Sequence, residues 1–270
     1  MIRLNVSLAL WFGLAVPLPA LADCSRPLQV PVAPIGQAVT VTDGKVGGIF
    51  PELLRAEAAK AGCVIEFQPV PRSRLEKLFE LGQADLLMPA RRSVRRDEYG
   101  HFVGMIHSRA VLLAIEPRVP AIRSAAELLR HRELRVGVVR GYDYDDSYQV
   151  LVKQLAAQQR LTEATDPVSL ARMLDAGTID VAVVTPTAVT GALRASGKWA
   201  PLVERLHSIP VDELVWGESG AYVSRHASLS EADRRIAREM LEHIAKSGAA
   251  WREFQRYFPE ANLSESVRAH

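Results

Sequence analysis

The sequence predicts an α/β protein of two lobes, with a parallel-rich sheet in each lobe and hinge strands between them. Two separate blocks of the chain alternate short apolar strands with helices, which is the pattern of parallel strands covered by helices. An apolar strand at 110–115 separates the blocks, and a return strand at 220–224 follows the second one. The chain therefore crosses between the lobes twice, and two crossings make a hinge beside a cleft that can close on a ligand.

The first block alternates strands and helices over short intervals. Pro51 falls in the first turn of a predicted helix, where its missing N–H is not needed. Apolar residues between Phe50 and Ala58 recur at helical spacing, and the glycine that follows is a common helix end. The predicted elements are strands at 28–35, 63–70 and 85–88, a hairpin turning at Asp43-Gly44, and two helices that end at Gly62 and Gly82.

The second block repeats this pattern. Its segment 179–184 is almost entirely apolar, which is typical of a strand buried on both faces of a parallel sheet. Gly177 ends the helix before that strand. The predicted elements are strands at 133–139 and 179–184, helices at 145–159, 169–174 and 186–196, and, after the return strand, helices around 236–244 and 251–257.

The first 22 residues have the features of a signal peptide. Arg3 precedes a short apolar run, and Ala20-Leu21-Ala22 has the small-x-small form of a cleavage site. We expect a soluble mature chain from Asp23; Cys24 leaves a lipoprotein as an alternative, although Asp23 directly before it suits lipoprotein processing poorly. The predicted division is 1–22 for the signal peptide, 23–113 plus 216–270 for lobe 1, and 114–215 for an inserted lobe 2.

Charge and cysteine content indicate which partners and which covalent links to expect. The formal net charge is +2, so no basic excess is present to follow a phosphate backbone, and we expect no nucleic-acid partner. Export favours pairing of the two cysteines, Cys24 and Cys63. Each precedes a predicted strand, and the ends of adjacent strands lie about 5 Å apart, which is within disulfide reach. A disulfide is therefore predicted; the alternative is two separate buried thiols.

The segment from Gly82 to Phe102 resembles the family 3 extracellular solute-binding proteins, which are the polar amino-acid-type receptors of ABC importers. The family pattern is Gly-x-x-Asp, an apolar strand, Thr-x-x-Arg and a later Phe. The resemblance covers nearly the whole mature chain and implies the type II fold of periplasmic binding proteins. The matching residues are Gly82, Asp85, Ser93 in place of the Thr, Arg96 and Phe102, and in the second block Gly137, Gly141, Gly177 and Asp180.

The resemblance implies that Arg96 binds a ligand carboxylate, because a guanidinium can hold a carboxylate with two hydrogen bonds. Ser93 could add a hydroxyl donor, and backbone N–H groups at Gly141 and Tyr142 could meet the same anion. The alternative is that Arg96 belongs to a solvated basic face with its neighbouring arginines. Family members usually carry an Asp for the ligand's ammonium where this chain has Thr185, so Asp143, Asp145 or Glu218 replaces it, or the ligand lacks an amine.

Two further features belong to this predicted site. Arg72 and Arg74 follow the second strand on the edge that faces the cleft, where they could bind a second acidic group or remain exposed at a helix start. Phe50 and Tyr142 are candidate apolar walls, although Phe50 is equally compatible with the core.

These observations predict a monomeric periplasmic binding protein that captures a small carboxylate ligand and passes it to ABC permease subunits. Hydrolase motifs and metal-ligand spacings are absent from the sequence, so we expect no catalysis, no metal and no cofactor. One alternative is an enzyme on the same scaffold, similar to cyclohexadienyl dehydratases, in which Glu218 or Asp143 would act as the acid. Another is a protein that presents its ligand to a separate sensor.

Overall fold

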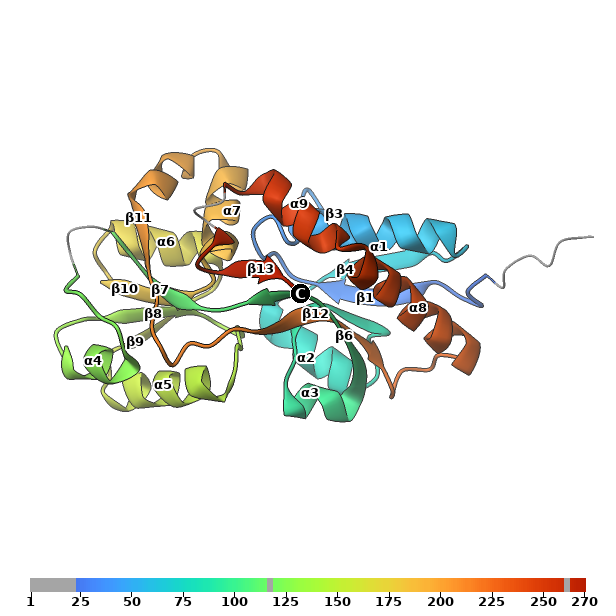
Figure 1. Cartoon of the computed structure of the whole chain (residues 1–270), viewed down its shortest axis with the longest axis horizontal. Helices are drawn as coiled ribbons and strands as arrows, with labels where there is room; N and C mark the ends of the chain where they lie inside the picture. The colour runs from blue at the N-terminus through green and yellow to red at the C-terminus, as the bar shows by residue number, and fades with distance from the viewer. Residues whose placement is uncertain (1–22, 116–118, 260–262) are drawn as a thin grey trace, which may run out of the picture.

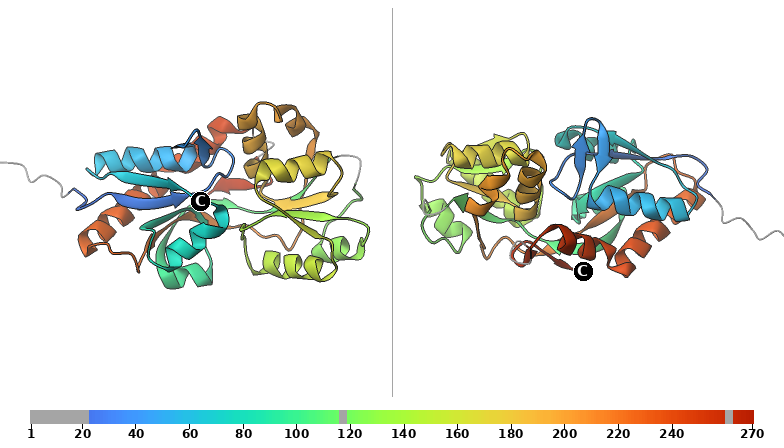
Figure 2. Two further views of the ribbon diagram at one scale, coloured as in Figure 1. Left: turned by 180° about the vertical axis from the view of Figure 1, so that it is seen from behind. Right: turned by 90° about the horizontal axis from the view of Figure 1, so that it is seen from above.

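The computed structural model describes residues 23–115, 119–259 and 263–270. Two α/β lobes lie side by side, and the C-terminus lies at the junction between them (Figure 1, Figure 2). The two-lobed α/β class predicted from the sequence is confirmed. The predicted signal peptide lies outside the described residues, and none of the described helices is long and apolar enough to cross a membrane.

The first lobe combines one parallel strand pair with a four-stranded antiparallel sheet. Its strands are β1 (Leu28–Val32) paired with β4 (Ile65–Pro69), the hairpin β2 (Thr40–Thr42) and β3 (Lys45–Gly47), and the sheet β13 (Val267–Ala269), β6 (Gly100–Ser108), β12 (Gly217–Ser224) and β5 (Leu86–Arg91) in that order. Its helices are α1 (Ile49–Lys60), α2 (Arg72–Glu80), α3 (Val94–Tyr99), α8 (Glu231–Ser247) and α9 (Ala249–Tyr257).

The sequence does not predict β6 or β13. The polar and glycine residues of β6 interrupt its apolar alternation, and β13 has only three residues. Because the chain leaves the lobe along β6 and returns along β12, these two strands pair antiparallel, so parallel pairing in this lobe is confined to β1 and β4.

The second lobe is built on a five-stranded sheet. Three neighbouring strands on one side of this sheet pair in parallel. The strand that enters the lobe runs antiparallel to both of its neighbours. The strands, in sheet order, are β11 (Leu206–Ile209), β7 (Val111–Ile115), β10 (Val181–Val184), β8 (Val136–Val139) and β9 (Leu161–Ala164). The helices are α4 (Ala125–Arg130), α5 (Asp146–Ala157), α6 (Pro167–Asp175), α7 (Pro186–Ser196) and a 3-10 helix (Ala200–Arg205).

Side-chain caps explain where several helices begin. Ser93, Ser124, Asp145, Asp166 and Ser230 each accept a hydrogen bond from the backbone N–H three residues later. Such a cap satisfies one of the N–H groups that a helix start leaves unpaired and stabilises the helix by about 1 kcal/mol. The same short polar residues therefore set the helix starts in both lobes.

Each lobe has its own hydrophobic core. One cluster of buried residues extends from Ala110 to Leu214 and surrounds the five-stranded sheet. Another joins residues between Leu28 and Ile106 with residues between Ala221 and Val267. The predicted boundaries between the lobes stay a prediction; β7 already pairs within the second sheet from Val111.

The chain crosses between the lobes twice, after β6 and before β12, and the C-terminal segment packs on both crossings. The Arg109 backbone N–H donates to the Ser266 carbonyl at 3.0 Å, and Arg109 Nε donates to the Glu265 carbonyl at 2.7 Å. The ring of Trp216, in the second crossing, contacts the guanidinium groups of Arg109 and Arg268 at 4.8 and 4.5 Å from its centroid. The tail thus links the two crossings to each other.

The predicted disulfide between Cys24 and Cys63 is present, with the two Cα atoms 4.9 Å apart. Leu28 pairs with Ile65 in the parallel register of β1 and β4, which brings the segments before both strands together. The geometric argument from adjacent parallel strands is therefore confirmed.

Candidate ligand-binding cavity

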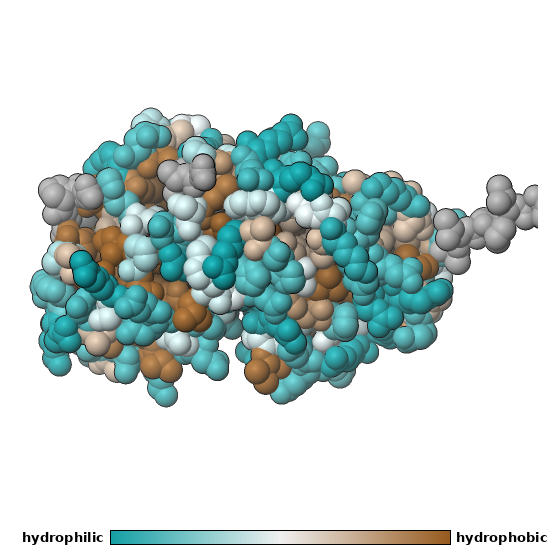
Figure 3. Space-filling view, viewed as in Figure 1, coloured by the Kyte–Doolittle hydropathy of each residue, from teal (hydrophilic) through white to brown (hydrophobic). Residues whose placement is uncertain are grey.

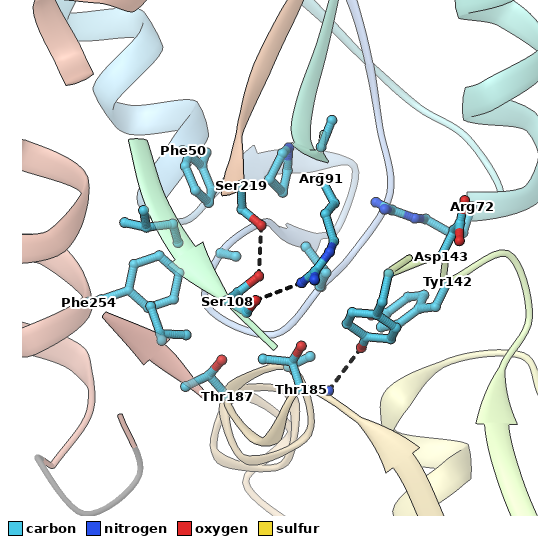
Figure 4. Close-up of a pocket in the computed structure, with 18 residues that line it drawn as sticks. Phe50, Arg72, Arg91, Ser108, Tyr142, Asp143, Thr185, Thr187, Ser219 and Phe254 are labelled. Atoms are coloured by element: carbon cyan, nitrogen blue, oxygen red, sulfur yellow. Dashed lines mark hydrogen bonds between the residues drawn. The ribbon is translucent and has the colours of Figure 1, made fainter. Parts of the chain in front are cut away.

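A cavity lies between the two lobes and takes side chains from both of them (Figure 4). Its empty volume, including the part open to solvent, is about 670 Å³. Figure 3 shows a notch between the lobes on one face of the molecule. The first lobe contributes residues from β5, β6, β12, β13 and α9, and the second contributes residues 142–144 and the start of α7. The cavity is therefore completed only when the lobes are together.

Arg72 is the first charged group of the cavity. It is the first residue of α2, and its guanidinium extends towards the centre of the cavity (Figure 4). Burial lowers the pKa of Arg72, because removal from water penalises the charged form. Among the described residues, no carboxylate or carbonyl accepts a hydrogen bond from it; its nearest partner is the ring of Tyr142, with 5.4 Å from Cζ to the centroid. Since arginine keeps its proton, this cation is suited to an incoming anion.

Tyr142 lines the cavity beside Arg72. The residue is 8% exposed, and its hydroxyl is buried without a hydrogen-bond partner in the part of the chain that the structure describes. A buried hydroxyl without a partner costs about 1–3 kcal/mol, so such groups are rare outside functional sites. Tyr142 and Arg72 therefore offer two unsatisfied donors on the same side of the cavity.

Arg91, at the end of β5, links the two lobes. Its Nη1 donates to the Ser108 carbonyl at 2.6 Å, and its Nη2 donates to the Val215 carbonyl and to Asp145 Oδ2, both at 3.0 Å. Asp145 belongs to the second lobe, where it also caps α5. The side chain of Arg91 is 6% exposed and that of Asp145 is 22% exposed, so this interlobe ion pair is partly shielded from water.

Asp143 is the third charged residue that lines the cavity. Its Oδ1 accepts a hydrogen bond from Gln149 Nε2 at 2.7 Å. No arginine, lysine or histidine among the described residues forms an ion pair with it. Of the three acids considered from the sequence, Asp143 lines the cavity, Asp145 is engaged by Arg91, and Glu218 lies outside the cavity lining, against Arg92 and His270.

Arg96, the residue predicted to bind the ligand carboxylate, does not line the cavity. It is buried on α3, where its Nε and Nη2 each donate to Glu76 at 2.9 Å and its Nη1 donates to the Arg91 carbonyl at 2.8 Å. Burial lowers the pKa of Arg96, but hydrogen bonds and charge from Glu76 outweigh this and raise it overall. A ligand contact at Arg96 stays a prediction, and it would require Glu76 to release the guanidinium.

Ser93 and Arg74 also lie outside the cavity lining. The Ser93 hydroxyl caps α3 by accepting from Arg96 N, and the Ser93 N–H donates to the Tyr222 hydroxyl at 3.1 Å. Arg74 is exposed on α2. Helix α3 is not among the helices predicted from the sequence, and the Ser93 hydroxyl, predicted as a donor to the ligand, caps it.

The other predicted residues are near or in the cavity. Phe50 and Thr185 line it. The Thr185 N–H donates to the Tyr144 hydroxyl at 2.9 Å, and its own hydroxyl donates to the Arg109 carbonyl at 3.2 Å, so Thr185 ties α7 to the hinge. Gly141 has φ of 78° and faces α2: a Cβ on it would lie 3.2 Å from Ser73 N. A glycine is therefore needed where the two lobes approach each other.

Several lining residues were not singled out from the sequence. Arg91 is one of the arginines that neighbour Arg96 in the sequence, and nothing in that run distinguishes it from the others. Ser108 and Ser219, whose hydroxyls are 2.7 Å apart, come from strands that only tertiary pairing defines. Phe254 and Val267 reach the cavity from the C-terminal segment. Within the described ranges, no group of three or more His, Cys, Asp or Glu side chains could hold a metal ion.

Comparison with family models and with curated proteins gives no match. Solved structures match across most of the chain. A histidine kinase sensor domain with similarity to periplasmic binding proteins is 18% identical, with a TM-score of 0.69, and the match covers 92% of this chain and 100% of that one. An ancestral arginine-binding protein bound to arginine is 18% identical, with a TM-score of 0.66 over 89% and 100% of the two chains.

A third structure is the substrate-binding protein of an ABC uptake transporter from Streptococcus pneumoniae with bound histidine. It is 15% identical, with a TM-score of 0.67 over 86% of this chain and 92% of that one. Identities this low are evidence for fold alone, and the fold implied by the sequence resemblance is confirmed. The chain has the two-lobed α/β fold of the periplasmic binding proteins.

Proposed function

We propose that this protein is a periplasmic solute-binding protein that captures a small carboxylate-bearing ligand between its lobes and delivers it to an ABC importer. The observation that carries the proposal is the Arg72 guanidinium, which faces the interlobe cavity without an acidic partner among the described residues. The Tyr142 hydroxyl beside it is buried and has no hydrogen-bond partner among residues 23–115, 119–259 and 263–270, so it is a second group that a bound carboxylate would satisfy.

Capture occurs by hinge closure. Residues 23–113 with 216–270 and residues 114–215 move as two bodies about the crossings, and the closed form brings Arg72 of one against Tyr142 of the other. The Arg91–Asp145 ion pair joins the same two bodies. A ligand that contacts both lobes stabilises the closed form by its differential affinity for it. The protein acts as an exported monomer, released from its signal peptide after Ala22.

A thermal-shift screen of the purified protein tests this proposal. The panel contains amino acids, keto acids, dicarboxylates and aromatic acids, and the matched amines and alcohols without a carboxylate. A ligand at 100 times its dissociation constant should stabilise the fold by about 2.7 kcal/mol. We expect stabilisation by at least one carboxylate and by none of its carboxylate-free analogues.

Two substitutions in α2 test whether Arg72 contacts the ligand carboxylate. Arg72→Met keeps most of the apolar stem and removes the charge, and should weaken binding of that carboxylate by about 30-fold or more, since loss of a buried charged contact costs 2 kcal/mol or above. Arg74→Met, an exposed arginine two residues further along the same helix, is the matched control and should bind as the wild type does. The proposal would be contradicted if the wild type, Arg72→Met and Arg74→Met bound the carboxylate equally tightly. It would also be contradicted if no compound of the panel stabilised the protein.

A further inference from the structure

The cavity has two chemically different ends. Phe50 and Phe254 form one end, with their rings in an edge-to-face contact at 6.0 Å between centroids. Ile106 and Val267 are further apolar residues of the cavity lining. Figure 4 shows the two phenylalanine rings on the side opposite to Arg72, Tyr142 and Asp143. A charged ligand group placed against the two rings would lose its hydration, because Arg72 and Asp143 lie at the other end of the cavity.

The other end carries balanced charge. Of the three charged side chains that the described residues contribute to the lining, Arg91 is already paired with Asp145. This leaves one cation, Arg72, and one anion, Asp143, without an ion-pair partner in the described part of the chain. A ligand with a carboxylate alone would satisfy Arg72 but would bring a second negative charge close to Asp143. A zwitterionic head satisfies both groups.

We infer that the cavity binds an α-amino acid with an apolar side chain, with the carboxylate at Arg72 and the Tyr142 hydroxyl, the ammonium at Asp143, and the side chain against Phe50 and Phe254. This rests on the proposed function and narrows its ligand class. Thr185 carries no charge that could pair with an ammonium, whereas Asp143, in the loop before α5, is a carboxylate in the same lining.

The C-terminal segment contributes apolar residues to the cavity. Phe254 comes from α9 and Val267 from β13, and both are almost fully buried, at 3% and 2% exposure. Val267 pairs with Ser108 at the end of β6, and the Glu265 carbonyl, just before β13, accepts from Arg109 in the first crossing. This apolar wall is therefore attached to the crossing between the lobes.

Calorimetric titration with matched ligand sets tests the inference. One set is L-phenylalanine, 3-phenylpropanoate and phenethylamine; the other is L-leucine, 4-methylpentanoate and 3-methylbutylamine; L-arginine and L-glutamate represent polar side chains. We expect L-phenylalanine or L-leucine to bind at least tenfold more tightly than L-arginine and L-glutamate. Removal of either charged group from the ligand should lower the affinity by about 30-fold or more.

The variant Asp143→Asn separates the two charges of the head. It should weaken binding of the amino acid and leave binding of the matched acid without an amine unchanged or tighter. Asp146→Asn, an exposed acid three residues later on α5, is the control and should change neither.

The outcomes distinguish failure of the inference from failure of the proposed function. Tighter binding of L-arginine or L-glutamate than of the apolar amino acids would overturn the inference about the side chain, while a carboxylate receptor would remain. Equal binding of the acid and the amino acid, with no effect of Asp143→Asn, would overturn the ammonium assignment. If no carboxylate of the wider panel binds, both the inference and the proposed function are wrong.

Discussion

Replacing Asp145 by asparagine tests whether the Arg91–Asp145 ion pair stabilises the closed arrangement of the lobes. Asp145 accepts from Arg91 Nη2 at 3.0 Å and, through its other oxygen, from the Tyr148 N–H at 2.8 Å as the cap of α5. Asparagine is as good a helix cap as aspartate, so the variant can keep the cap of α5 through its oxygen. The carboxylate oxygen that accepts from Arg91 is replaced by an uncharged NH2 group, which cannot accept a hydrogen bond. The perturbation is therefore specific to the contact between lobes.

The expected size of the effect follows from the burial of Arg91. A hydrogen bond that involves a charged group contributes about 1.5–3 kcal/mol, which corresponds to a factor of about 10 to 150 in the ratio of closed to open protein. In the open form both side chains regain water, so the loss falls on the closed form. Ligand affinity should fall by up to the same factor, because binding requires the closed form.

Two measurements check this prediction. Small-angle X-ray scattering should show an unchanged or larger radius of gyration for the unliganded variant, and titration with the carboxylate identified by thermal shift should show weaker binding. Asp166→Asn is the matched control, because Asp166 caps α6 in the same lobe and contacts no residue of the first lobe among its hydrogen bonds. If Asp145→Asn binds as tightly as this control, the ion pair does not stabilise closure.

Four further predictions concern single features of the molecule. Although burial raises the pKa of Glu76, hydrogen bonds and charge from Arg96 hold it below its usual value. A lowered carboxyl pKa stabilises the fold above about pH 4.3, the unfolded value, and this contribution is lost as the pH falls through the folded pKa. Glu76→Gln should cost about 3 kcal/mol near neutral pH and flatten the acid limb of a denaturation series; an unchanged acid limb would contradict this. The double variant Cys24→Ser/Cys63→Ser should lose about 4 kcal/mol in urea unfolding, as expected for a loop of 39 residues, and a change below 1 kcal/mol would show that the bridge constrains little. Gly36→Ala should weaken ligand binding by opposing closure, because φ is 55° and a Cβ would lie 2.7 Å from the Ala188 carbonyl oxygen in the other lobe; Gly44→Ala, which meets no neighbour within 4 Å, is the control. Finally, hydrogen bonds from His270 and Arg92 lower the pKa of Glu218, which makes it a poor acid at neutral pH, so we expect no turnover of prephenate or arogenate; measurable product formation would support the dehydratase alternative.

Local pattern determined much of the fold from the sequence alone. Alternating apolar strands and helices predicted two α/β lobes, and the helix predicted from Asp145 begins in the structure with Asp145 as its cap. The disulfide followed from two adjacent parallel strands, each with a cysteine before it. These features depend on residues close in sequence or on one strand pair, so periodicity and spacing are sufficient to find them.

The lining of the candidate cavity depends on contacts between residues that are far apart in the sequence. Arg91, Arg95 and Arg96 are similar in a one-dimensional pattern, but β5 directs Arg91 into the cavity while α3 directs Arg96 to Glu76. Phe254 and Val267 follow the second lobe by many residues and become a wall of the cavity only because α9 and β13 pack against β6. Which arginine is left without a partner is decided by the position of every nearby carboxylate, and only the tertiary structure brings those carboxylates together.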